Sequence, residues 1–479
     1  MSGTALRSPG QPQGVGACLA FFEAVDRRID VEGVRDAQDA RIEGFPYLRV
    51  NRLLAALETQ GPHDRLAEWI ERLAALDRAA RRFELANLPD SARSELQAST
   101  ELAEAASLEA IAETCRQRLI ERDLSSPERL GRLGERAIVP PDYSRWKRVL
   151  GLYAITSLPF SAGTERLESQ LQATFDAPAL PSEGQRMSYG AAENLPLPPA
   201  AVRQIMQRSA SNLLGLREPS AEDRAQLIAA FAPEFVVDET GSHDRIGALH
   251  WREPGTLAVD VDEPVVYARI AHTLVGGRAL LQLVYIIWFS ERPAESRFDL
   301  LSGHLDGVIW RVTFTPDGEP WIFDSIHPCG CYHQFFTTAR AQRRPAPRPM
   351  EEWAFTPERL PRLSAGERVR VYLATRTHYI QKVETAGHAL ANRTYRLVDA
   401  DVLRSLPQPG DGRRSAFGPD GIVPGTERAE RFFFWPMGIA SPGAMRQWGK
   451  HATAFVGERH FDDADLLERR FVLLDARID

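Results

Sequence analysis

Cysteine and lysine are scarce in this sequence. Only four cysteines occur among 479 residues, which is too few for a disulfide framework in a chain of this length and fits a reducing compartment. Arginine carries nearly all of the positive charge, because only Lys147, Lys382 and Lys450 are lysines; this bias is typical of a GC-rich bacterial genome. We therefore expect a cytoplasmic protein.

Long apolar runs, a basic surplus and a secretion signal are also missing. No run of ~18 apolar residues could cross a bilayer, and the first residues lack the apolar core of a secretion signal. Val15–Cys18 resembles a lipoprotein cleavage box, so a cell-envelope lipoprotein anchored through Cys18 is the alternative if the true start lies upstream. The net charge of -7 gives no reason to expect nucleic-acid binding. The expected partner is an unknown small molecule or protein.

The signatures of common enzyme classes are absent as well. HExxH, GxSxG, GxGxxG and CxxC do not occur, so the usual metalloprotease, serine hydrolase, dinucleotide and redox functions have no positive support. Any catalytic function must therefore rest on a less common arrangement of residues.

The first third of the chain has the periodicity of helices. Leu66, Trp69, Ile70, Leu73 and Ala80 form one apolar stripe. A stretch rich in proline, glycine and serine follows at residues 177–199, and such composition is typical of a linker. We therefore predict a helical domain over residues 1–176, a linker over 177–199 and a second domain over 200–479.

Strand patterns begin beyond Ala248. Two apolar runs, residues 264–274 and 279–289, flank Gly276-Gly277, a turn that predicts a hairpin. The second run is apolar on both faces, which places it centrally in a sheet. The predicted fold class is α+β, with a helical N-terminal domain followed by an antiparallel, β-rich domain that carries peripheral helices.

Residues 307–327 predict a second hairpin. Thr315-Pro316-Asp317-Gly318 suits a type I turn followed by a glycine bulge, with Gly318 at positive φ. In that register Arg311 faces Phe323 on the neighbouring strand. The strand then runs on into a group of histidines and cysteines.

This group falls at every second position: His327, Cys329, Cys331 and His333. In an extended strand all four side chains would line one face. The outer two would then be ~20 Å apart, too far for one metal ion unless the chain curls at the intervening proline and glycine.

Three interpretations of this group stay open. The first is a metal site, zinc being the expected ion, with His327, Cys329, Cys331, His333 and His304 as ligands; its weakness is that zinc-binding cysteines usually have two to four residues between them. The second is a thiol nucleophile, Cys331 or Cys329, with a histidine as base and Asp324 orienting it. The third is that the cysteines pack as small hydrophobic residues.

Two functions follow from these interpretations. One is a metal- or thiol-dependent enzyme, hydrolase-like, that uses the Cys/His strand. The other is a non-catalytic binding or scaffold protein in which this strand is structural. His451 and His460 are weaker candidates for a catalytic or ligand role.

Overall fold

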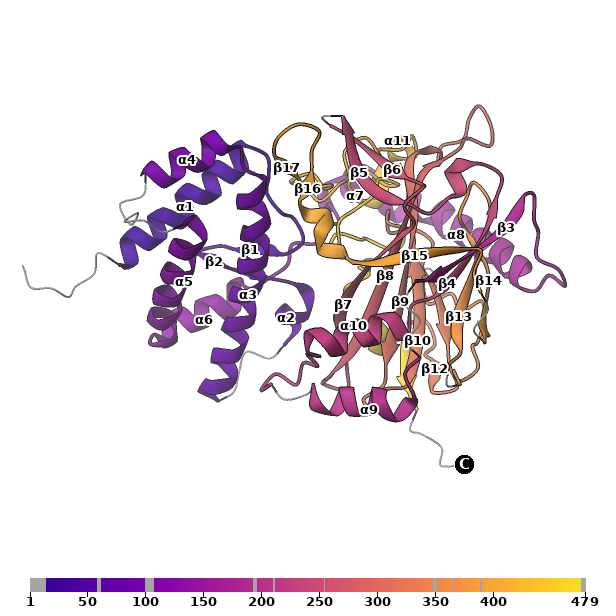
Figure 1. Cartoon of the computed structure of the whole chain (residues 1–479), viewed down its shortest axis with the longest axis horizontal. Coiled ribbons are helices and arrows are strands. Elements are labelled where there is room, and N and C mark those ends of the chain that lie inside the picture. The colour runs from indigo at the N-terminus through magenta and orange to yellow at the C-terminus, as the bar shows by residue number, and fades with distance from the viewer. Residues whose placement is uncertain are drawn as a thin grey trace, which may run out of the picture.

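The computed structural model describes residues 14–57, 62–99, 107–192, 196–209, 212–253, 255–347, 351–364, 366–387 and 390–474. It contains a group of N-terminal helices beside a larger part built around a twisted sheet (Figure 1). The predicted α+β fold class is thereby confirmed. Within the described ranges, no helix is both long and apolar enough to cross a bilayer.

The N-terminal part consists of helices around a short hairpin. Its elements are α1 (Val15–Val31), β1 (Ala40–Ile42), β2 (Phe45–Val50), α2 (Arg52–Ala56), α3 (His63–Asn87), α4 (Asp90–Ser99), α5 (Leu108–Leu124) and α6 (Pro127–Arg136). The predicted stripe lies on α3, where Trp69, Ile70, Leu73 and Ala80 are buried. This apolar stripe packs the helix into the N-terminal core.

A disulfide joins α1 to α5. Cys18 and Cys115 are bonded across a sequence separation of 97 residues, and both are buried. Disulfides persist mainly in oxidising compartments, so this bond speaks against the expected reducing environment. Lipid attachment at Cys18 would require that the bond be absent.

The larger part is built on a ten-stranded sheet. In spatial order its strands are β11 (Gln334–Thr337), β10 (Pro320–Ile326), β9 (Gly303–Phe314), β8 (Arg278–Arg292), β7 (Val265–Val275), β15 (Arg393–Asp399), β3 (Gln185–Ala191), β4 (Glu234–Glu239), β13 (Arg368–Leu373) and β14 (Ile380–Ala386). Most neighbours are antiparallel, but β15 runs parallel to both β7 and β3, and β4 runs parallel to β13.

The central position of β8 is confirmed. Every residue from Ala279 to Phe289 is buried, and β8 pairs with β7 on one side and β9 on the other. Side chains alternate between the two faces of a strand. Both faces of β8 must therefore be covered.

Different segments cover the two faces. Helices α9 (Pro199–Arg208) and α10 (Ala221–Ala230) lie on one face (Figure 1), where Ile205 and Leu227 join a core with Leu283. On the other face, Leu403 and Phe461 pack with Ile286.

The remaining short elements are β5 (Ala248–Glu253), β6 (Thr256–Asp260), β12 (Ala341–Arg343), η1 (Ser242–Asp244), η2 (Ala400–Arg404), β16 (Leu406–Pro407), β17 (Arg413–Arg414), α11 (Arg431–Phe434), η3 (Trp435–Met437), α12 (Leu466–Arg470) and β18 (Phe471–Leu473).

The segment between the helices and the sheet contains regular structure. β3 lies within residues 177–199 and pairs with β15 and β4. Before it, α7 (Arg145–Leu150) and α8 (Tyr153–Phe175) contact the C-terminal region: the Phe160 ring centroid is 5.1 Å from that of Phe434. The predicted division into residues 1–176, 177–199 and 200–479 stays a prediction.

The predicted register of the β9–β10 hairpin is wrong by one residue. The turn itself is as expected, since the Gly318 N–H donates to the Thr315 carbonyl at 3.0 Å and Gly318 has φ 88°. Beyond it, however, Arg311 faces Asp324 instead of Phe323. The register shifts between Pro320 and Ile322, because Trp321 is an extra residue, a β-bulge.

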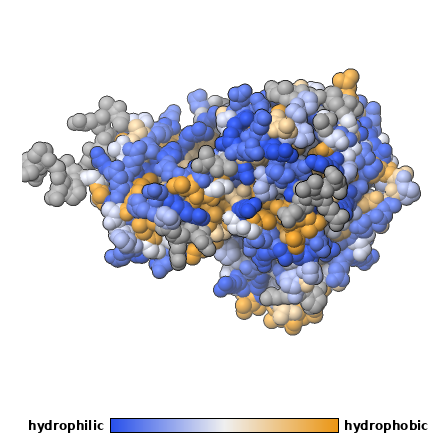
Figure 2. All heavy atoms as spheres, turned by 90° about the horizontal axis from the view of Figure 1, so that it is seen from below, coloured by the Kyte–Doolittle hydropathy of each residue, from blue (hydrophilic) through white to orange (hydrophobic). Residues whose placement is uncertain are grey.

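The face of the molecule shown in Figure 2 is mostly polar. In the view of Figure 2, hydrophilic residues predominate and hydrophobic residues gather in a few separate groups. Scattered apolar residues are normal on a protein surface, whereas contiguous groups indicate contact sites.

Candidate functional site

The alternating histidines and cysteines do not continue strand β10, so the extended-strand interpretation is wrong. The Gly330 N–H donates to the His327 carbonyl at 2.8 Å, and the His327 N–H donates to the Cys331 carbonyl at 3.0 Å. Proline in the second position and glycine in the fourth therefore form the same kind of turn as Thr315–Gly318. The chain then reverses into β11.

The turn is held closely against a distant segment. Gly330 has φ 93°, and a Cβ atom at this position would lie 2.2 Å from the carbonyl oxygen of Ala452. Glycine is thus required here for both its backbone conformation and its lack of a side chain. Tyr332, next to the turn, also has positive φ, at 60°.

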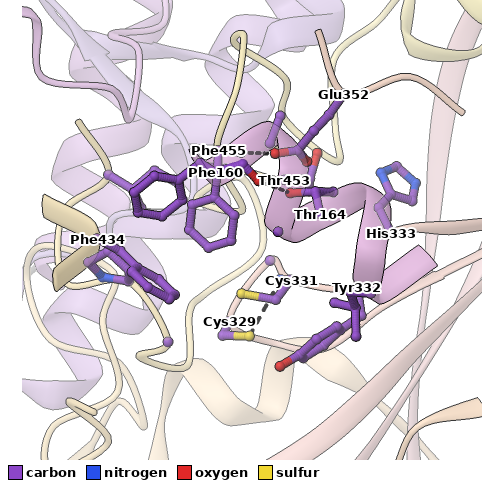
Figure 3. Close-up of a pocket in the computed structure, with 18 of the residues that line it drawn as sticks. Phe160, Thr164, Cys329, Cys331, Tyr332, His333, Glu352, Phe434, Thr453 and Phe455 are labelled. Atoms are coloured by element: carbon purple, nitrogen blue, oxygen red, sulfur yellow. Dashed lines mark hydrogen bonds between the residues drawn. The ribbon is translucent and has the colours of Figure 1, made fainter. Parts of the chain in front are cut away.

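The turn brings the two thiols together. The Cys331 N–H donates to Sγ of Cys329 at 3.4 Å, and Figure 3 shows the two sulfur atoms side by side. A hydrogen bond from the Cys331 thiol lowers the pKa of Cys329, whereas the same contact raises the pKa of Cys331 well above its usual range. Cys329 is therefore the better thiolate of the two.

Both cysteines lie at the wall of a cavity of about 420 Å³. Apolar side chains form most of the remaining wall (Figure 3): Pro159, Phe160, Leu167, Leu171, Leu301, Phe355, Phe434, Ile439, Pro442 and Phe455. They come from α8 and from the segments that follow residues 300, 350 and 430. A cavity of this size and lining is typical of a site for a small apolar molecule.

Three carboxyl groups interrupt the apolar lining: Glu168, Glu352 and Glu430. Burial raises the pKa of Glu168 and of Glu430 to about 7, and it also raises the pKa of Glu352. Protonated carboxyl groups can donate hydrogen bonds to a neutral ligand. An anionic ligand would be disfavoured by any carboxylate that loses its proton.

His333 is held by Asp324. Its Nε2 lies 3.0 Å from Oδ2 of Asp324, and that carboxylate also accepts hydrogen bonds from Arg311. Burial lowers the pKa of His333 to about 3, which keeps its imidazole neutral. Asp324 thus orients a histidine, as expected, but Figure 3 shows this imidazole pointing away from the two thiols.

His327 belongs to a buried chain of acids and imidazoles. Its Nδ1 lies 3.2 Å from Oδ1 of Asp306, whose Oδ2 lies 2.8 Å from Nδ1 of His378. Nε2 of His378 lies 3.4 Å from Oδ1 of Asp244. Burial would raise the pKa of Asp306, but His327 and His378 outweigh it and hold that pKa well below its usual range. Asp306 is therefore ionised.

The five predicted metal ligands do not form one set. Cys329 and Cys331 are adjacent, His327 and His333 are bound to carboxylates, and Nε2 of His304 donates to the Leu257 carbonyl oxygen at 2.9 Å. Among the described residues, no group of three or more His, Cys, Asp or Glu side chains is placed to hold a metal ion.

The two weaker candidates also lie outside the cavity wall. His451 is buried against Trp448 and Phe461, and neither ring nitrogen has a hydrogen-bond partner. His460 lies near Asp142 and Asp463. Both positions fit packing and local ion pairing.

Several residues of the site were not identified from the sequence. His378 is one of them: it lies in the loop after β13 and is fully buried. No sequence pattern around Glu352 or Glu430 identifies them as residues of the site. The aromatic run Phe432–Trp435 was the one available signal for the cavity wall.

Comparison of the chain with models of protein families, with curated proteins and with solved structures found no match. The function is therefore inferred from the geometry of the cavity.

Proposed function

We propose that this protein is a thiol-dependent enzyme in which Cys329 and Cys331 act together on an apolar small molecule. The observation that supports this most strongly is the pair of neighbouring thiols at the wall of an apolar cavity of about 420 Å³. Burial of a single cysteine would be ordinary packing. Two thiols that contact each other and also border a cavity are a reactive arrangement.

The chemistry that suits this pair is reduction of a bound substrate by two electrons. With a hydroperoxide, the Cys329 thiolate attacks the terminal oxygen, the O–O bond breaks, and the alkoxide leaves and takes a proton as the alcohol. The Cys331 thiol then attacks the sulfenic sulfur and water leaves. Two thiols and one hydroperoxide thus give one disulfide, one alcohol and one water.

The hydrolase-like alternative has less support. A hydrolytic thiol needs a base within hydrogen-bond reach. Figure 3 shows the His333 imidazole pointing away from the two thiols. Burial also lowers the pKa of both His327 and His333, which makes each imidazole a weaker base. The low pKa of Cys329 arises instead from Cys331, followed by the charge of Arg428.

The cavity also indicates the polarity of the substrate. Its wall is mostly aromatic and aliphatic, and its polar groups include the carboxyls of Glu168 and Glu430, whose pKa values are raised to about 7. A neutral, apolar substrate avoids repulsion from these carboxyls once they ionise. An anionic substrate would not.

A second candidate is a non-catalytic binding protein for the same kind of molecule. Its support is that Cys329 is only 4% exposed and that both neighbouring histidines are fixed by carboxylates. In this case the cavity would hold a ligand while the thiols merely pack.

Oxidation of the reduced dithiol tests the proposal. Cumene hydroperoxide serves as a neutral, apolar probe, and peptide mass mapping detects a Cys329–Cys331 disulfide, while the Cys18–Cys115 bond serves as an internal reference. We expect oxidation about tenfold faster than that of N-acetylcysteine, because reactivity follows thiolate character and access.

Two variants provide matched controls. C331S should leave a sulfenic acid on Cys329 that dimedone traps. C329S should react more slowly, because burial still raises the pKa of the remaining Cys331 thiol when the contact with Cys329 is lost. Oxidation of the wild type no faster than that of free cysteine would overturn the enzyme proposal. Binding of neutral Nile red under those conditions would favour the binding protein.

A further inference from the structure

An exposed apolar surface lies where α7, α8 and α11 meet. We call it the apolar face and define it by Trp146, Val149, Leu152, Ile155, Phe432 and Phe433. Each of these side chains is between 59% and 73% exposed. Large apolar side chains that gather in this way on a protein surface indicate a contact site.

The residues of the apolar face come from two segments that are distant in the sequence but pack against each other. The Ser144 N–H donates to the Gly438 carbonyl at 2.8 Å, which holds the start of α7 against the end of η3. A Cβ atom on Gly151 would lie 2.5 Å from Cβ of Pro436. The two segments therefore pack directly on each other.

The backbone at the centre of this face is held in an unusual conformation. Leu152 lies between α7 and α8 with φ 49° and ψ 49°, in the left-handed region. This conformation is unfavourable for a residue with a side chain and is maintained only by its surroundings. Its result is that Leu152 points an apolar side chain, 63% exposed, into solvent.

The charged residues near the apolar face indicate what kind of surface binds there. The chain has a net charge of -7, yet no Asp or Glu occurs within residues 143–164 or 431–457. Arg145, Lys147 and Arg431 lie within these two segments and are at least partly exposed. Four acidic residues border these segments. Asp142 and Glu458 are paired with arginines, Glu430 is buried, and Glu165 is exposed.

An apolar surface with tryptophan and basic residues, but without acids, fits the interface of an anionic bilayer. Tryptophan favours the boundary between headgroups and acyl chains, and basic side chains attract anionic headgroups. A second copy of this chain would supply no matching negative surface of its own from the same segments. The composition therefore favours lipid over self-association.

The apolar face also borders the cavity of the thiol pair. Phe434 on α11 lines the cavity wall and directly follows Phe433 of the face, and Phe160 on α8 lines the same wall five residues after Ile155. A molecule that dissolves in a bilayer would thus meet the cavity at its edge.

We propose that the apolar face docks the protein onto an anionic phospholipid surface, with α7 and the first turns of α8 lying in the headgroup region. This inference does not depend on the reactivity of the thiols, because it rests on the exposed residues and their charge. No part of the described chain needs to cross the bilayer.

Vesicle co-sedimentation of the full chain tests this proposal. We expect about tenfold more bound protein on vesicles of phosphatidylcholine with about one third phosphatidylglycerol than on phosphatidylcholine alone. Raising the salt from about 0.1 M to about 0.5 M should weaken the binding, because screening shortens the range of the attraction.

Matched variants distinguish lipid binding through the apolar face from non-specific adsorption of the protein to vesicles. F432S/F433S should lose about tenfold or more of the binding, whereas F298S, which removes another exposed phenylalanine (87% exposed) from a different surface, should bind as the wild type does. K147E should remove much of the preference for anionic lipid. Circular dichroism and the melting temperature verify that each variant is folded.

Two outcomes would overturn the proposal. One is wild-type protein that stays in solution with both vesicle compositions. The other is a concentration-dependent dimer, seen by analytical ultracentrifugation and lost in F432S/F433S, which would assign the face to a second copy of the chain.

Discussion

Arg311 and Asp324 face each other across β9 and β10 and form a buried, bidentate ion pair. Nε of Arg311 lies 2.9 Å from Oδ1 of Asp324, and Nη2 lies 2.5 Å from Oδ2. Asp324 also fixes His333, so one carboxylate joins the hairpin to the end of the cysteine turn. The Arg311 guanidinium lies 3.7 Å from the centre of the Phe461 ring, which covers it.

Loss of this carboxylate should be costly. D324A leaves the buried Arg311 guanidinium without an opposite charge, with only the Phe461 carbonyl, among the described residues, as its remaining acceptor. We expect the free energy of unfolding to fall by about 3–5 kcal/mol. D317A is the matched control, since Asp317 pairs with Arg340 at a site 38% exposed and should cost no more than about 1 kcal/mol. Urea unfolding measures both. Equal losses would contradict the assigned role of Asp324.

The two turn glycines should differ in their tolerance of alanine. Both have positive φ, but a Cβ at Gly318 meets movable side chains, at 3.1 Å from Val202 and 3.2 Å from Met206, whereas at Gly330 it meets a backbone carbonyl at 2.2 Å. G318A should cost about 1 kcal/mol and G330A at least about 2 kcal/mol more. Denaturant unfolding compares them; G318V should cost at least as much as G318A.

The Cys18–Cys115 disulfide should stabilise the N-terminal helices. A bond that closes a loop over 97 residues restricts the unfolded chain, so C18A/C115A should lose about 2–5 kcal/mol. Thermal melting followed by circular dichroism, with and without reductant, measures the effect. If reductant does not change the wild-type melting curve, the bond contributes nothing under those conditions.

The free energy of unfolding should fall as the pH rises through the range in which the Glu430 carboxyl loses its proton. Burial raises the pKa of this carboxyl to about 7, so the unfolded chain ionises it at lower pH than the folded protein does. The folded state therefore loses stability between about pH 4.5 and 7 and loses no more above that range.

The variant E430Q should remove this loss. Its unfolding free energy should fall less than that of the wild type between pH 5 and 8, by about 1–3 kcal/mol. Glu168 titrates in the same range, so some pH dependence should remain. E165Q, at an exposed position of α8, is the control and should follow the wild-type profile. An E430Q profile identical to the wild type would place the titration elsewhere.

Limited proteolysis tests the predicted division of the chain into residues 1–176, 177–199 and 200–479. Strand β3 protects residues 185–191 by pairing on both sides, so we expect first cuts in residues 177–184 or 192–198, where the chain is polar and proline-rich. Mass spectrometry of early fragments locates the cuts. Early cleavage within β8 would contradict its central position.

The sequence predicts local structure here better than it predicts contacts between distant segments. The type I turn at Thr315–Gly318 and the buried strand β8 follow from proline, glycine and apolar patterns over a few residues. The register of β9 and β10 does not, because Trp321 leaves the ladder to pack with Leu280 and Leu466, which lie 41 residues before it and 145 residues after it. Only tertiary packing determines that bulge.

The same limit applies to the site. His327-Pro328-Cys329-Gly330 has the turn signature of Thr315–Gly318, yet the even spacing of its reactive residues favoured a strand. The adjacency of the two thiols could have been predicted from that proline and glycine. The apolar wall of the cavity could not, because it comes from α8 and from residues beyond 430, which no local pattern connects to the turn.

Strand β15 determines when the large sheet can be completed during synthesis. In the ladder of the described strands, β15 lies between the five strands β7 to β11 and the four strands β3, β4, β13 and β14. It joins them through three residue pairs with β3 and four with β7. Until residue 399 has left the ribosome, these two halves have exposed edges and no ladder between them. Such non-local parallel pairing is slow. Folding should therefore pass through an intermediate in which the halves are formed but not yet joined, and this is the state most exposed to aggregation.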